Sequence, residues 1–205
     1  MSESTAGKPV SELPVAPDPT IADPAPLGLA AFAMTTLILS LANTKTWPAG
    51  VTSALSLALA YGGGVQILAG MWEFKRNNTF GATAFSSFGA FWISFWYLNV
   101  HLVPSVPAAD VPDIVGTFLL GWCVFTAYMT IASLRVSAAV ALVFVLLTVT
   151  FVFLTIGGFH SSEHLTKVGG WFGVATAAAA WYASFAGVTN STFRRTVLPV
   201  FPLAR

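Results

Sequence analysis

The sequence has very few charged residues. Only 8% of its 205 residues are Asp, Glu, Lys or Arg, whereas ordinary soluble domains carry about 25%. Apolar residues make up 56% of the chain, and the mean hydropathy is +0.76. The net charge is +1 without a basic patch, which argues against a nucleic-acid-binding protein. A single cysteine, Cys123, cannot form a disulfide framework within the chain.

The few charges are also unevenly placed. Six long intervals lack them: those between Asp23 and Lys45, Lys45 and Glu73, Arg76 and Asp110, Asp113 and Arg135, Arg135 and Glu163, and Lys167 and Arg194. Each interval is longer than the about 20 apolar residues that a helix needs to cross a bilayer. The apolar runs are continuous rather than alternating, which favours helices over barrel strands. The sequence therefore predicts an all-α integral membrane protein with transmembrane helices at residues 27–41, 51–71, 82–102, 114–133, 138–156 and 168–188.

The segments outside these spans are short. Residues 1–22 are rich in Ser, Pro and Glu and predict a disordered tail; residues 23–193 form one membrane domain, and residues 194–205 a C-terminal tail. Seven of the nine Lys and Arg residues fall on the side of the two tails, and only Lys45 and Lys167 fall on the other. Because positive charge is retained inside, both termini are expected in the cytoplasm.

No group of residues suits catalysis or metal binding. His160, Glu163 and His164 match the H-x-x-E-H pattern of a zinc protease, but no Asp, Glu, His or Cys follows to complete a ligand set. No ionisable residue lies in the middle of any predicted span, where proton-relay transporters usually carry one. The sequence therefore predicts no enzyme, no cofactor and no metal site, and favours a passive or gated pathway.

The first predicted span has a distinctive face. Gly28, Phe32, Thr36 and Ser40 recur every four residues, which is typical either of a pore constriction or of a helix-packing stripe. Just before this span, Asp23 is expected to cap the helix, although exposed amides at a helix start can also hold an anion.

Polar residues also occur within the second and third spans. Gln66 either forms an interhelical hydrogen bond or lines a substrate path. Thr83, Ser87 and Ser94 make a hydroxyl stripe; such hydroxyls can replace water around a small polar solute, or can bond back to their own helix.

Several motifs resemble those of the acetate uptake transporters, also called succinate–acetate permeases. The stretch Asp23-Pro24-Ala25-Pro26-Leu27-Gly28-Leu29 resembles the family signature N-P-A-P-L-G-L. Residues 61–74 and 78–92 resemble the family's second and third spans, and residues 195–199 resemble its C-terminal end. The resemblance covers nearly all of the chain after Ile21.

This resemblance implies a six-helix protomer in a ring-shaped hexamer, with a pore through each subunit. It implies movement of acetate, and in some members succinate or other short carboxylates, across the plasma membrane. The family's hydrophobic constriction of Phe, Tyr and Leu corresponds by motif position to Phe32, Phe88 and Leu147. Two departures stand out, because Asp23 replaces the signature Asn and Phe88 replaces the Tyr.

The predicted function is therefore carboxylate transport through a narrow apolar neck, either channel-like or linked to protons. A bare carboxylate loses tens of kcal/mol of solvation in an apolar medium, so hydrogen-bond donors must replace its water. The candidates are Thr36, Gln66, Thr83 and Ser87. Two other hypotheses stay open at this point: a channel for ammonium or a small neutral solute, and a membrane sensor or scaffold that does not conduct.

Overall fold

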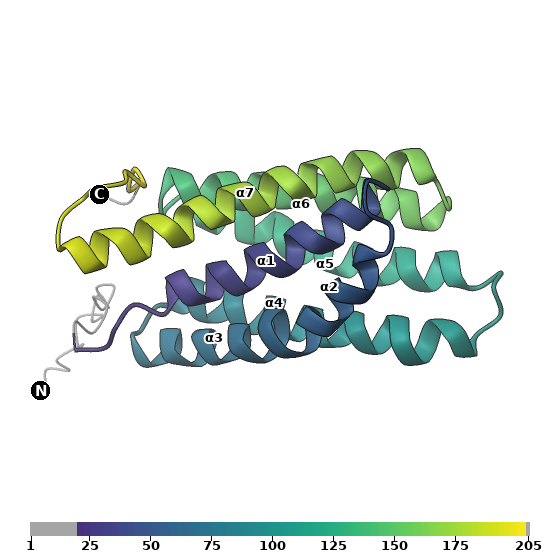
Figure 1. Cartoon of the computed structure of the whole chain (residues 1–205), viewed down its shortest axis with the longest axis horizontal. Helices are drawn as coiled ribbons and strands as arrows, with labels where there is room; N and C mark the ends of the chain where they lie inside the picture. Colours follow the sequence, from purple (N-terminus) through teal and green to yellow (C-terminus); the bar gives the residue numbers. More distant parts are fainter. Residues whose placement is uncertain (1–19, 204–205) are drawn as a thin grey trace, which may run out of the picture.

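The computed structural model describes residues 20–203. The predicted disordered tail lies almost entirely outside this range. Within it, the chain is built from long helices that run side by side along the longest axis (Figure 1). The extended pairing in this part of the chain is one isolated bridge, between Ser137 and Pro202. The predicted all-α fold is confirmed.

The helices follow one another with short connections. In chain order they are α1 (Ala25–Asn43), α2 (Gly50–Leu59), η1 (Ala60–Val65), α3 (Gln66–Lys75), α4 (Thr79–Tyr97), η2 (Leu98–Leu102), η3 (Val103–Ser105), α5 (Val111–Ser133), α6 (Ala138–Phe159) and α7 (Glu163–Phe193). The segments α2, η1 and α3 form one continuous helical stretch whose middle is a wider π-helix. Single wide turns of this kind are typical of functional sites.

Glycines in the π-helix let neighbouring helices approach closely. A Cβ atom placed on Gly62 would lie 2.5 Å from Oγ1 of Thr35 in α1, and one placed on Gly63 would lie 2.6 Å from Cγ1 of Ile93 in α4. Because glycine lacks that atom, η1 fits between α1 and α4.

Four of the helical stretches are long and apolar enough to cross a membrane. They are α1, the continuous stretch Gly50–Lys75, α5 and α6. The other two long helices, α4 and α7, carry many small, hydroxyl-bearing and aromatic side chains. Four of the predicted spans are thus supported by length and composition.

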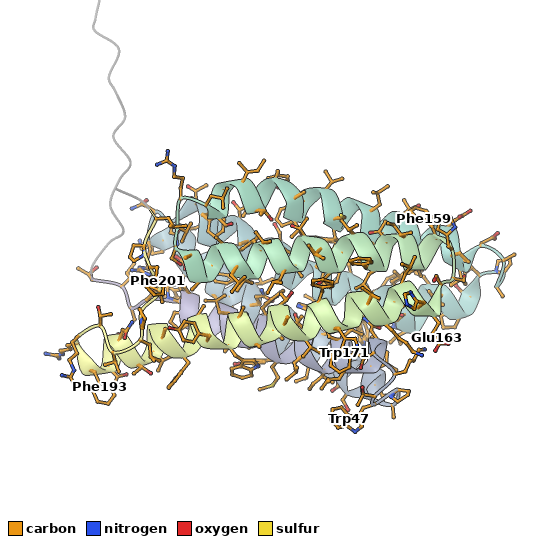
Figure 2. The ribbon with its side chains drawn as sticks, turned by 90° about the horizontal axis from the view of Figure 1, so that it is seen from above. Trp47, Phe159, Glu163, Trp171, Phe193 and Phe201 are labelled. Carbon is orange, nitrogen blue, oxygen red and sulfur yellow. The ribbon has the colours of Figure 1, made fainter. Side chains whose placement is uncertain are left out.

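The α6–α7 turn and the C-terminal segment lie at opposite ends of the bundle (Figure 2). Phe159 and Glu163, on either side of the α6–α7 turn, lie at one end, whereas Phe193 and Phe201 lie at the opposite end (Figure 2). The first described residues lie at the same end as the C-terminal end of α7 (Figure 1). At that end the C-terminal segment folds back, since the Tyr182 hydroxyl donates a hydrogen bond to the carbonyl of Pro199 at 2.7 Å.

Candidate functional site

Two cavities lie inside the helical bundle, one towards each end. The first, which we call the Glu73 cavity, measures about 80 Å³ and includes Ala25, Gln66, Glu73 and Asn78 in its lining. The second, the Thr36 cavity, measures about 240 Å³ and includes Thr36, Ser40, Asn43, Asn99, Thr150 and Thr166. Both linings are mostly apolar, with a few polar groups, as is typical of small-molecule sites.

Three residues line both cavities. They are Phe32 on α1, Phe88 on α4 and Leu147 on α6, and no other residue of 20–203 is common to the two linings. The rings of Phe32 and Phe88 meet with their centroids 5.7 Å apart and an interplanar angle of 56°. All three side chains are buried. The three residues assigned to the constriction by motif position thus lie together where the cavities meet.

Phe88 is held by further aromatic contacts. Its ring meets Phe125 edge-on at a centroid distance of 5.3 Å, and it lies 6.0 Å from the ring of Phe144. Tilted and edge-on pairs of this kind stabilise a packed position by about 0.5–1.5 kcal/mol each. The boundary between the cavities is therefore a packed apolar cluster, in which the Phe88 ring is held by its neighbours.

Two of the four predicted substrate-lining residues reach the cavities. Thr36 lines the Thr36 cavity and Gln66 lines the Glu73 cavity. Oγ1 of Thr36 and Oε1 of Gln66 are buried and have no hydrogen-bond partner within residues 20–203. The interhelical hydrogen bond considered for Gln66 is thus not made by its Oε1 within the described residues.

Thr83 and Ser87 line neither cavity. The α4 residues that do, including Ala84, Phe88 and Phe91, lie on a different side of this helix. Successive residues are about 100° apart around a helix, so the predicted hydroxyl stripe points elsewhere. A role for these two hydroxyls in the pathway stays a prediction.

The signature segment starts α1 and fixes it to its neighbours. Oδ1 of Asp23 accepts a hydrogen bond from the backbone N–H of Ala25 at 3.1 Å, but the N-cap of α1 is Pro24, which makes no side-chain capping bond, so Asp23 lies one residue before the N-cap position rather than at it. The same oxygen pairs with Arg76 at the end of α3. The carbonyl of Pro26 accepts a hydrogen bond from Ser184 of α7 at 2.6 Å.

Close packing explains the signature glycine. A Cβ atom placed on Gly28 would lie 2.6 Å from the ring of Phe85 on α4. Leu27 is half exposed and Pro24 carries the carbonyl that accepts from the N–H of Gly28 at 3.1 Å. The signature thus positions α1, and with it Phe32, against α4 and α7.

The sequence reasoning missed Glu73 and Asn78. It placed Glu73 just beyond the second span, but α3 continues to Lys75 and the Glu73 side chain is 0% exposed. Asn78 caps α4 and donates a hydrogen bond from Nδ2 to Oε2 of Glu73 at 2.8 Å. The available signal was spacing, because Glu73 follows Gln66 by two helical turns and so shares its face.

A third hollow adjoins the Thr36 cavity at the end of the bundle that holds Glu163. It measures about 350 Å³, includes Lys45, Ser162 and Glu163, and shares Thr166 with the Thr36 cavity. The hydrogen bond and charge of Lys167, with the charge of Lys45, lower the pKa of Glu163. The carboxylate at this mouth is therefore paired, since Nζ of Lys167 lies 2.7 Å from Oε1 of Glu163.

A helical membrane bundle with cavities in series defines a membrane channel or transporter. The sequence profile of the GPR1/FUN34/yaaH family matches residues 6–205, and the chain belongs to this family. Relatives of the chain are named as an acetate permease and a succinate-acetate/proton symporter, so the expectation that the chain is not an enzyme is confirmed, as is the resemblance to acetate transporters.

Characterised relatives point to small solutes. The chain is 39% identical to the succinate-acetate/proton symporter SatP of Escherichia coli, over 88% of this chain and 95% of that protein. It is 37% identical to ammonia transport outward protein 2 of Saccharomyces cerevisiae, over 92% of this chain and 68% of that protein. The solved structure of the bacterial acetate channel SatP superimposes with a TM-score of 0.82 at 38% identity, covering 88% of this chain and 99% of that one.

Proposed function

We propose that this protein carries acetate, together with succinate or other short carboxylates, across the plasma membrane. The observation that carries the proposal is that the Glu73 and Thr36 cavities have only Phe32, Phe88 and Leu147 in common within residues 20–203. A path along the bundle would therefore pass these three side chains. The relatives named for acetate support the choice of solute.

The proposed pathway has, on each side of an apolar neck, a mostly apolar vestibule with a few polar groups. On one side, Thr36 offers an unpaired hydroxyl. On the other, Gln66 offers a side-chain amide whose Oε1 is unpaired. Such groups replace part of the water that a carboxylate loses, while Phe32, Phe88 and Leu147 form a hydrophobic constriction of the kind that gates by dewetting. Passage as the neutral acid lowers the solvation cost, so inward flux is expected to rise at low external pH.

The proposed arrangement in the membrane has six spans and cytoplasmic termini. The lengths of α4 and α7, 19 and 31 residues, suit two further crossings besides the four more apolar stretches. The termini of the described chain lie at one end of the bundle (Figure 1), which supports the even number. We further propose a hexameric ring of such protomers, with one path in each.

Uptake of labelled acetate into proteoliposomes, with and without an inward pH gradient, tests the function. We expect saturable acetate uptake that exceeds that of protein-free vesicles and rises when the outside is acid. Unlabelled succinate should compete if short dicarboxylates share the path. Uptake no greater than in empty vesicles at every pH would contradict the proposal.

Ammonium is the second candidate solute, and a yeast relative named for ammonia transport supports it. Competition between acetate and ammonium in the same vesicles separates the two hypotheses. Protein that moves neither solute would instead indicate a sensor or scaffold that does not conduct.

A further inference from the structure

A buried carboxyl group lies on the Glu73 cavity with one oxygen unpaired. Glu73 is 0% exposed and belongs to the cavity lining. Its Oε2 accepts the hydrogen bond from Nδ2 of Asn78 at 2.8 Å, whereas Oε1 is buried without a hydrogen-bond partner in residues 20–203. Nearly all buried polar atoms in native proteins have a partner, so this oxygen requires an explanation.

Charged neighbours do not neutralise the group. The charged side chains that act on it are Asp23, before α1, and Arg76, at the end of α3. These two form an ion pair with each other, and the salt bridges of the described chain do not include Glu73. From α4, Asn78 supplies the only hydrogen bond to the carboxyl group in residues 20–203.

The backbone of α4 closes one side of the carboxyl group. A Cβ atom placed on Gly81 would lie 2.8 Å from Cδ and 2.9 Å from Oε1 of Glu73. Asn78 occupies Oε2, and Val140 and Phe144 of α6 contribute apolar lining across the cavity. Residues 20–203 thus supply no partner for Oε1, and Glu73 belongs to the lining of a cavity that could hold one.

We propose that Glu73 couples carboxylate passage to one proton, by admitting a substrate carboxylate to the Glu73 cavity only when the two share a proton. This inference rests on the proposed carboxylate transport. Two carboxylates at one site cannot both be ionised without strong repulsion. The ligand class of this cavity is therefore a small carboxylic acid paired with the Glu73 carboxylate through an O–H···O⁻ hydrogen bond.

The step is balanced in charge and atoms. One carboxylate and one proton enter from one mouth, and the proton lies between a substrate oxygen and Oε1 of Glu73. When the substrate leaves by the other mouth, the proton leaves with it as the neutral acid, and Glu73 is again ionised. Each passage then moves one carboxylate and one proton, with no net charge, while Asn78 keeps Oε2 occupied and Oε1 free.

Planar-bilayer current and vesicle proton uptake test this coupling in the full chain. At neutral pH and with an acetate gradient, we expect the wild-type protein to take up acetate and protons together with little current. Glu73→Gln keeps an oxygen for the Asn78 hydrogen bond but removes the charge, so acetate can enter as an anion. We expect acetate current to rise about tenfold or more, as removal of a like charge at contact distance implies, and proton uptake per acetate to fall.

Two further variants separate charge from packing. Asn78→Ala removes the hydrogen bond but keeps the carboxylate, so its current should stay as low as in the wild type. Asp110→Asn is the matched control, because this exposed carboxylate lies before α5 and outside the cavity linings of the described chain. A large current from Asn78→Ala would show that packing, not charge, excludes the anion, and would overturn the inference.

Other outcomes also decide the question. Wild-type coupling retained in Glu73→Gln overturns the role of Glu73 but leaves acetate transport standing. A wild-type protein that carries acetate as a current, without protons, also overturns the role of Glu73 and leaves acetate transport standing. A wild-type protein that moves no acetate overturns the proposed function, and this inference with it.

Discussion

Phe32 of α1 and Phe88 of α4 meet at a centroid distance of 5.7 Å, at the boundary between the Glu73 and Thr36 cavities. Phe88 replaces the Tyr that the family resemblance implies, so an entirely apolar pair stands where one hydroxyl is expected. Because both rings are apolar, this pair offers no hydroxyl to a passing solute. Adding a hydroxyl at Phe88 is therefore the first test.

Phe88→Tyr should raise acetate uptake. The added hydroxyl can donate a hydrogen bond to a passing carboxylate, and such a bond is worth about 0.5–1.5 kcal/mol, or roughly two- to tenfold in rate. Initial rates of labelled-acetate uptake measure the effect. Phe153→Tyr is the control, because Phe153 stacks on Phe172 and lines neither cavity. Equal rates in all three proteins would remove Phe88 from the path.

Leu147→Ala should widen the neck and favour larger acids. Leu147 is buried on α6 between the two cavities, whereas Leu142 on the same helix is 52% exposed. We expect the ratio of succinate to acetate uptake to rise about tenfold or more, because one methylene group in an apolar pocket changes discrimination by about 1–3 kcal/mol. Leu142→Ala should leave the ratio unchanged. A shift of the same size in both variants would point to altered folding instead of selection.

Gly62→Ala should destabilise the protein. The new methyl group would lie 2.5 Å from Oγ1 of Thr35, and overpacking of this kind costs about 1–3 kcal/mol. Gly121→Ala is the matched control, because a Cβ there meets nothing within 4 Å and alanine favours a helix by about 1 kcal/mol. Thermal unfolding in detergent should therefore order the proteins as Gly121→Ala, wild type and Gly62→Ala, from most to least stable. The reverse order would contradict the close approach of η1 and α1.

Lys167→Gln should raise the pKa of Glu163 towards its ordinary value of 4.5. The hydrogen bond and charge of Lys167 are the largest causes of the lowered pKa. A carboxylate whose pKa is lowered by folding stabilises the folded state above its unfolded pKa. That contribution is lost as the pH falls through the folded value, below 4.5. Carboxyl NMR titration of the two proteins measures the shift, and identical titration curves would show that the pair does not form in solution.

Part of the candidate site could be predicted from the sequence. Motif position was sufficient to group Phe32, Phe88 and Leu147, which the structure brings to one boundary. Their roles as a constriction remain to be tested by the variants above. The hydroxyl stripe shows the limit of this reasoning, because periodicity tells which residues share a face but not what that face meets. Thr83 and Ser87 share a face that lies away from both cavities.

The sequence by itself determined that this is an all-helical membrane protein of the acetate transporter type, because uncharged length and short motifs are local properties of the chain. Only the tertiary structure decided which buried polar groups have no hydrogen-bond partner. Glu73 lies between two aromatic residues and just before two basic ones, in a stretch whose composition is typical of the end of a span. Its burial depends on Gly81 and Asn78 of the following helix. Solvation and pairing are set by atoms from distant parts of the chain, and for Gln66 and Glu73 those atoms leave an oxygen free beside a cavity.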